Sequence, residues 1–255
     1  MSLDIWTQCG AEANVGPRSW VAWRVVEGQH RVATLPLVDT LADQARLEQL
    51  IDSAKPPRSA DPAFDNLHYL LSTPFRYPPL RHGSRFGTVD QLSIWYGALE
   101  LDTALGEVAY YRLLFLEGTA ADLREVRSEY TAFRVGVETP RGVDLTGPGF
   151  ADFADALTDP AGYAAAQALG RAMRGAGVEA FCYASARRRG GRGVGLFTPR
   201  AFAARSPDPH VKTWKCLVTR GQVVFYRQGL TRPFDERRFD RAGFAVDGRL
   251  PAPAV

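Results

Sequence analysis

Arg85-Phe86-Gly87, Ser93-Ile94-Trp95-Tyr96-Gly97 and the segment from Asp102 to Phe115 decide how this chain folds. The second of these is rich in β-branched and aromatic residues, which predicts a strand. Apolar side chains recur at helical intervals in the third, so a helix follows the strand. Asp102 or Thr103 can cap that helix, because a short oxygen side chain accepts hydrogen bonds from the unpaired amides of the first turn.

Glu107 lies one to two turns into the predicted helix, beside its apolar stripe. A carboxylate in such a place is costly unless it is paired, hydrated or used in chemistry. Two interpretations therefore stand side by side: a structural ion pair with Arg85 or Arg112, and a functional carboxylate beside a binding site.

Length and composition indicate a globular protein, since the chain has 255 residues of which 45% are hydrophobic. No apolar run approaches the roughly 20 residues that a membrane span needs. The first residues, 1–12, lack a basic start followed by an apolar core, so no secretory signal is visible. We therefore expect a cytoplasmic protein without a membrane partner.

Metal and nucleic-acid binding are not favoured by the sequence. The cysteines Cys9, Cys182 and Cys216 are far apart, and the histidines are equally scattered, so no metal site or cofactor is expected. A net charge of +3 argues weakly against a direct nucleic-acid partner. The arginine-rich run at 187–193 is a local exception, read as a solvated surface loop, a charged lid over a phosphate site, or a nucleic-acid contact, in that order of preference.

The first half of the chain combines a strand with a helical segment. Residues 20–26 predict a strand with Arg24 inside an apolar run, where it needs either a carboxylate of the fold or an anionic ligand. Helical spacing from Leu37 to Ala54 ends at Lys55-Pro56-Pro57, which suggests that 28–71 is a helical insertion. The prolines of 74–79 predict an extended piece without helix.

The second half predicts more strands and one alanine-rich helix, 161–176. Strands are expected at 131–137, 142–146, 180–184 and 194–197, and a hairpin at 212–219 and 222–226. The fold class is therefore mixed α/β, with a central mixed sheet and flanking helices. We expect a single domain over 1–255, with its core at about 18–27 and 72–227 and a frayed tail at 249–255.

Common catalytic motifs are absent, and arginines, aromatics, one glutamate and one serine remain. Arg76, Arg81 and Arg85 would repel one another unless they shared an anion. Arginines hold phosphate oxygens, aromatic faces stack on a flat ring, and a carboxylate stabilises positive charge growing on a ribose carbon. The set suits a ligand with a diphosphate and a cationic ring, such as NAD+.

A family resemblance rests on several short motifs in a fixed order. They are Ser84-Arg85-Phe86, Trp95-Tyr96-Gly97, Thr103-Ala104-Leu105-Gly106-Glu107, Val143-Asp144-Leu145-Thr146, Tyr183-Ala184-Ser185-Ala186-Arg187 and Val194-Gly195-Leu196-Phe197. Over roughly residues 20–200 the chain resembles the RES domain, which is named for an arginine, a glutamate and a serine.

This resemblance implies a fold akin to ADP-ribosyltransferase toxins. It also implies an NAD+ phosphorylase or glycohydrolase activity, with NAD+ and inorganic phosphate as substrates, in the toxin of a bacterial type II toxin–antitoxin pair. A small helical DNA-binding antitoxin would then cover the active cleft. Aromatic residues of the N-terminal region are suited to an interface between two copies, so a homodimer is a further alternative.

The resemblance also assigns roles to individual residues. Arg85 would grip the diphosphate or the incoming phosphate, and Tyr96 would line the nicotinamide ribose pocket. Glu107 would stabilise the ribosyl cation, and Ser185 would hydrogen-bond a ribose hydroxyl or a phosphate oxygen. Either Arg24 or Arg76 would fill the role of the family's earlier arginine.

Other functions stay open at this point. An ADP-ribosyltransferase or an NAD+ glycohydrolase would use the same site with a different acceptor. A non-catalytic module could instead use the arginines to hold a phosphate-bearing partner, with binding that falls steeply with salt.

Overall fold

The computed structural model describes residues 4–28, 38–57, 59–227 and 234–252. Within these ranges eight strands form one sheet in the order β1-β2-β5-β4-β3-β6-β7-β8. They are β1 (Gly16–Glu27), β2 (Trp95–Ala98), β3 (Glu125–Asp144), β4 (Ala180–Ala184), β5 (Arg192–Leu196), β6 (Lys212–Thr219), β7 (Gln222–Arg227) and β8 (Asp235–Asp240).

The sheet is mixed, because β3 and β4 are parallel while the other neighbouring strands pair antiparallel. In addition, β1 pairs with β3 along most of its length, from Gly16 opposite Gly142 to Glu27 opposite Tyr130. Strand β1 therefore contacts both β2 and β3, and it brings the two halves of the sheet order together. The expected mixed α/β class is confirmed.

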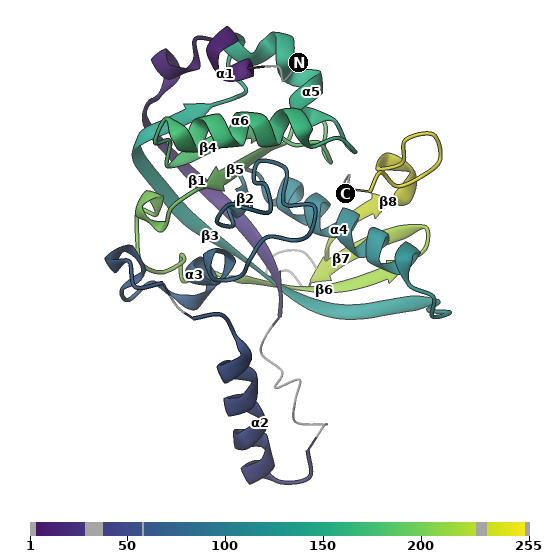
Figure 1. The fold of residues 1–255 in the computed structure, drawn as a ribbon. Helices are drawn as coiled ribbons and strands as arrows, with labels where there is room; N and C mark the ends of the chain where they lie inside the picture. Colours follow the sequence, from purple (N-terminus) through teal and green to yellow (C-terminus); the bar gives the residue numbers. More distant parts are fainter. Residues whose placement is uncertain (1–3, 29–37, 58, 228–233, 253–255) are drawn as a thin grey trace.

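The structure has six helices in its described ranges, and all except α2 pack on the sheet or at its ends (Figure 1). They are α1 (Ile5–Gln8), α2 (Leu41–Ala54), α3 (Tyr69–Arg76), α4 (Leu101–Gly118), α5 (Ala154–Thr158) and α6 (Ala164–Gly175). Short 3-10 turns are η1 (Ala11–Asn14), η3 (Pro62–Phe64), η4 (Pro148–Phe153), η5 (Pro199–Ala201) and η6 (Arg241–Gly243).

Two of the buried clusters lie under different helices. Helix α6 packs with α1 and α5 over β4, around a core that includes Phe86, Phe181 and Met173. Helix α4 packs over β6 and β7, around a core that includes Tyr110 and Trp214. The predicted strand and helix around Tyr96 and Glu107 therefore join two separately packed regions.

The start of α4 differs from the expectation. Its N-cap residue is Glu100, not Asp102 or Thr103, and the Glu100 side chain accepts no hydrogen bond from a first-turn backbone amide. Instead, the Glu100 carboxylate accepts from the Thr103 hydroxyl at 2.9 Å and from the Arg192 backbone N–H at 3.0 Å. The Glu100 carboxylate at the start of α4 thus also binds the backbone of β5, and local sequence does not reveal this contact.

The proline-rich piece at 74–79 was expected to contain no helix, and this was wrong. Pro74 lies inside α3, whose N-cap His68 accepts a hydrogen bond from the Leu70 amide. Proline removes a single backbone donor, and the short helix ends two residues later, so the loss falls in its last turn. Leu71, which is fully buried, anchors this helix to the body of the protein.

Two predicted strands, 131–137 and 142–146, are parts of one strand, β3, which continues through Pro140. Proline is tolerated there because no neighbouring strand pairs with Pro140 itself. Strand β8 was not predicted, since its sequence Asp-Glu-Arg-Arg-Phe-Asp is too polar to read as a strand. It forms at the edge of the sheet, where charged residues are common.

The predicted single domain, with an insertion at 28–71 and a frayed tail at 249–255, stays a prediction, but two features of the structure bear on it. Helix α2 projects away from the sheet (Figure 1), and residues 29–37 before it lie outside the described residues. At the other end, Leu250 is buried and the Pro251 carbonyl accepts a hydrogen bond from Tyr110. The chain is therefore packed up to Pro251, beyond the predicted start of fraying at 249.

None of the helices in the described ranges combines the length and apolar character that crossing a bilayer requires.

Candidate functional site

A cavity of about 560 Å³ opens between α4, β1, β2 and the loop before β2. This volume lies within the range of small-molecule sites. Its lining is aromatic and cationic, with Glu107 as its carboxylate. The arginines that line it are Arg24, Arg85, Arg112 and Arg187, and the aromatic residues are Trp23, Tyr77, Tyr96, Tyr111, Tyr163 and Tyr183.

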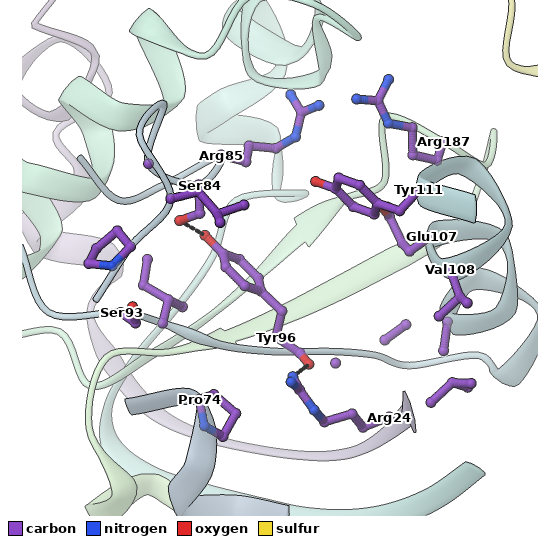
Figure 2. A pocket seen from close by; sticks show the side chains of 18 of the residues that line it. Arg24, Pro74, Ser84, Arg85, Ser93, Tyr96, Glu107, Val108, Tyr111 and Arg187 are labelled. Atoms are coloured by element: carbon purple, nitrogen blue, oxygen red, sulfur yellow. Dashed lines mark hydrogen bonds between the residues drawn. The ribbon is translucent and has the colours of Figure 1, made fainter. Parts of the chain in front are cut away.

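Glu107 faces this cavity from α4 (Figure 2) and is held by Ser185. The Ser185 hydroxyl donates to the Glu107 carboxylate over 2.7 Å. Burial raises the pKa of Glu107 above its ordinary value of 4.5, while the Ser185 hydrogen bond and the charges of Arg187 and Arg85 act to lower it. Within the described residues no ion pair joins Glu107 to Arg85 or Arg112, so the structural ion pair is not found.

Ser185 is buried and does not line the cavity. Its hydroxyl oxygen donates to Glu107 and accepts from the backbone N–H of Arg187 over 3.1 Å. Ser185 therefore orients the carboxylate from outside the lining, whereas the resemblance implied direct contact with a ribose or a phosphate.

Arg85 extends from a tightly held turn, Ser84 to Gly87. The Gln167 side chain donates to the Ser84 carbonyl over 3.0 Å, and the Tyr96 hydroxyl accepts from the Phe86 amide over 3.1 Å. At Gly170 a Cβ would lie 1.9 Å from the Phe86 carbonyl oxygen, so only glycine lets α6 approach this turn.

The Arg85 guanidinium stacks over the Tyr163 ring at 4.6 Å and donates to the Asp159 carbonyl over 2.8 Å. It makes no ion pair to a carboxylate in the part of the chain that the structure describes. A guanidinium held in place, with its charge unpaired, can accept an anion from the cavity.

Tyr96 and Arg24 meet at one side of the cavity (Figure 2). The Tyr96 hydroxyl lies 2.9 Å from the Ser84 hydroxyl, and burial raises the pKa of Tyr96 to about 12. Arg24 donates to the Tyr96 carbonyl and lies over the Trp95 ring at 5.2 Å. Burial lowers the pKa of Arg24 to about 10, so it remains charged at neutral pH.

Arg24 and Arg76 were both candidates for one role, and only Arg24 lines the cavity. Arg76 ends α3 and donates from its Nε to the Pro56 carbonyl over 2.5 Å. Arg81 is exposed and is not among the lining residues. The crowded arginines of this loop therefore do not share one anion.

Arg187 is a lining residue that sequence reasoning did not assign to the site. It is buried, with 8% of its surface exposed, and its guanidinium lies 3.6 Å from the centre of the Tyr110 ring. Its Nη2 donates to the Tyr163 hydroxyl over 3.4 Å. The preferred interpretation of this loop was a solvated surface loop, and a loop that contributes charge to a phosphate site was the second; Arg187 is buried in the cavity lining, which does not agree with the first.

Tyr163, Tyr111 and Tyr183 were also missed as a group. Tyr183 could have been found from its position two residues before Ser185, because alternate residues of a strand share a face. At Gly193 of the paired strand, a Cβ would lie 2.2 Å from the Tyr183 ring, so glycine makes room for this tyrosine beside the cavity. Tyr163 carries no local signal, since it lies in the irregular segment before α6.

Comparison with known proteins places this site in a family. The family model of the RES domain matches residues 55–217, which is more than half of the chain. This chain belongs to the RES domain family. The matched segment contains Arg85, Tyr96, Glu107 and Ser185, whereas Arg24 lies before it.

No curated protein sequence matches this RES domain protein. Among solved structures, it is similar to the M. tuberculosis MbcT–MbcA toxin–antitoxin complex, with a TM-score of 0.44 and 15% sequence identity. That similarity covers 85% of this chain and 92% of the other chain.

Proposed function

We propose that this RES domain cleaves NAD+ at the bond between nicotinamide and ribose and transfers ADP-ribose to inorganic phosphate. The observation that carries the proposal is Glu107, a partly buried carboxylate that faces a cavity and is oriented by Ser185. A carboxylate so held stabilises positive charge on a ribose carbon, as in the oxocarbenium-like transition states of glycoside cleavage.

The cavity also carries the charges that NAD+ requires. Arg24, Arg85 and Arg187 line it, and among the described residues none of the three forms an ion pair with a carboxylate. Guanidinium groups bind phosphate oxygens with two parallel hydrogen bonds, so these arginines can bind the diphosphate of NAD+. Tyrosine rings of the lining offer faces for the nicotinamide.

The proposed reaction needs no general acid. The C–N bond to the nicotinamide ring breaks, and its electron pair leaves with the ring, which becomes neutral. An oxygen of hydrogen phosphate forms the new bond to the ribose carbon, and the proton of hydrogen phosphate goes to solvent as the ester ionises. Glu107 is ionised in this scheme and stabilises the ribosyl cation without changing its own protonation.

A direct test incubates the purified chain with NAD+, with and without millimolar phosphate, and follows the products by phosphorus NMR and mass spectrometry. We expect nicotinamide together with a phosphorylated ADP-ribose, formed only when phosphate is present. Free ADP-ribose in both samples would indicate a glycohydrolase, and label retained on macromolecules of a lysate would indicate an ADP-ribosyltransferase. Intact NAD+ in every sample would reject the proposal and favour a binding module.

We further propose that the chain is the toxin of a toxin–antitoxin pair and that a helical antitoxin protein covers the cavity. Apolar side chains at the cavity edge support this, since Tyr77, Leu80 and Tyr111 are all lining residues with 39%, 65% and 47% of their surfaces exposed. Exposed apolar surface around a cavity is typical of a protein interface. Expression of the chain alone should arrest growth, and co-expression of the adjacent gene should relieve the arrest.

A further inference from the structure

The guanidinium of Arg187 is the most unusual charged group of the cavity lining. Only 8% of the residue is exposed, and its Nη1 has no hydrogen-bond partner within the described part of the chain. Such a buried donor costs free energy unless a ligand satisfies it. Asp159 lies close enough for Arg187 to lower the pKa of its carboxyl, but no ion pair between the two is formed among the described residues.

Arg187 is tied to Glu107 through the backbone. Its own N–H donates to the Ser185 hydroxyl, which in turn donates to Glu107. The Arg187 charge also opposes the burial effect on the pKa of Glu107 more strongly than the Arg85 charge does. Of the two arginines, Arg187 is thus more closely coupled to the carboxylate.

Arg85 and Arg187 contact opposite parts of one side chain. The Arg85 guanidinium lies over the ring face of Tyr163, and Arg187 donates to its hydroxyl. Figure 2 shows both side chains extending toward the same part of the cavity, with the Tyr111 ring below them in that view. The site therefore holds two separate guanidinium groups that can bind two different anions.

The two anions of the proposed reaction, the diphosphate of NAD+ and the acceptor phosphate, must lie at different distances from the ribose carbon that reacts. The diphosphate of NAD+ is attached through the 5′ oxygen, several bonds away from the ribose carbon that reacts. The acceptor must instead lie about 3–3.5 Å from that carbon when the bond forms. Because Glu107 stabilises charge on the same carbon, the arginine coupled to Glu107 is the one that meets the acceptor.

We propose that Arg187 binds the acceptor oxyanion, inorganic phosphate, beside Glu107, while Arg85 binds the diphosphate of NAD+. This assignment rests on the proposed function and adds to it a separate phosphate subsite. Tyr163 contacts both guanidinium groups, Arg85 at its ring face and Arg187 at its hydroxyl, so the two proposed subsites are neighbours that share this tyrosine.

The test measures the KM for phosphate at saturating NAD+ and the KM for NAD+ at saturating phosphate. We expect Arg187→Gln to raise the KM for phosphate at least about tenfold, because a charge-assisted hydrogen bond is lost. The KM for NAD+ should change much less. Arg188→Gln is the matched control, because Arg188 is the next residue, contacts Thr103 and lies outside the lining. An unchanged KM for phosphate, or a larger effect on NAD+, would overturn the assignment.

A second measurement needs no variant, in case Arg187→Gln does not fold. Sulfate is an oxyanion of similar size and charge that forms no stable product with the ribosyl group. In the wild-type chain it should inhibit competitively against phosphate and not against NAD+. Competition with NAD+ alone would instead place the oxyanion in the diphosphate subsite and reject the proposal.

Failure of the proposed function is recognised separately, as absence of turnover in the wild-type chain. The subsite is then tested by melting temperature against phosphate concentration, at constant ionic strength set with chloride. A saturable rise in the wild type and in Arg188→Gln that is lost in Arg187→Gln would support an oxyanion site at Arg187. The same rise in all three proteins, or no rise in the wild type, would reject it.

Discussion

The segments 76–85 and 187–192 are both rich in arginine, yet only one arginine of each segment lines the cavity. In the first segment it is Arg85, the last arginine of the run, and Arg76 contacts a backbone carbonyl elsewhere. In the second it is Arg187, the first arginine of the run. A cluster of arginines in the sequence therefore indicates which segment lies near the site, but not which of its arginines lines the cavity.

The two segments also hold their lining arginine in different ways. Arg85 is partly exposed and extends from a turn that Gln167 and Tyr96 fix. Arg187 is buried against Tyr110, and its loop is held by the pair between Arg192 and Glu100 at 3.3 Å. The difference favours an exchangeable ligand contact at Arg85 and a more rigid one at Arg187.

The largest effect is expected at Glu107, which lies between the two arginine segments. Glu107→Gln should reduce turnover about 10²–10³-fold, because the charge that stabilises the transition state is lost. Near wild-type turnover in this variant would contradict the role of Glu107 in stabilising the ribosyl cation. NAD+ consumption, followed by nicotinamide release, measures the effect.

The same variant should fold at least as stably as the wild type at neutral pH. Folding raises the pKa of Glu107, so the folded state binds the proton more tightly than the unfolded state does. The resulting loss of stability grows as pH rises through the raised pKa and is fully present above it. Glutamine removes this pH-dependent cost, which denaturant unfolding at several pH values would show.

A second effect separates Arg85 from Arg76 within one segment. Arg85→Gln should raise the KM for NAD+ about 10–100-fold, since charge-assisted contacts to the diphosphate are lost. Arg76→Gln is the control and should leave the KM for NAD+ near the wild-type value, because Arg76 is not a lining residue. Equal effects in the two variants would mean that the first segment acts as a diffuse positive surface.

A smaller effect is expected at Ser185, which joins Glu107 to the second segment. Its hydrogen bond holds the pKa of Glu107 down against burial, so Ser185→Ala should raise that pKa further. Less of the carboxylate is then ionised at a given pH, and the acid limb of the kcat profile moves to higher pH. A lower kcat with an unmoved acid limb would mean that Ser185 contacts the substrate directly instead.

The smallest effect is expected at Arg192, at the far end of the second segment. Its pair with Glu100 is partly exposed, and such pairs contribute about 1 kcal/mol or less. Arg192→Gln should therefore lower the free energy of unfolding by about 1 kcal/mol at most and leave turnover nearly unchanged. A large loss of turnover would mean that this pair controls the position of Arg187.

Much of the fold follows from local pattern. The strand at Tyr96, the helix of Glu107, the strand before Ser185 and the final hairpin were all predicted, because their residues have strong periodicity. Pro74 misled the prediction, since the cost of one proline in the last turn of α3 was outweighed by packing of buried neighbours such as Leu71.

The residue types of the site were visible in the sequence, but their contacts were not. Arg85, Tyr96, Glu107 and Arg24 line one cavity as the motifs suggested, because strand and helix order sets where each residue emerges. The choice of Arg24 over Arg76 depends on the pairing of β1 with β2, which joins segments more than 70 residues apart. No local rule contains that pairing.

The sequence by itself determined the mixed α/β class, the order of the elements and the kinds of side chain available for chemistry. Periodicity and residue type decide these properties, and both are local. Only the tertiary structure decided that Ser185 supports Glu107, that Arg187 is buried beside it, and that Tyr163 contacts two arginines. Burial and orphaned hydrogen-bonding groups are set by long-range packing, so these features become visible only once the chain is folded.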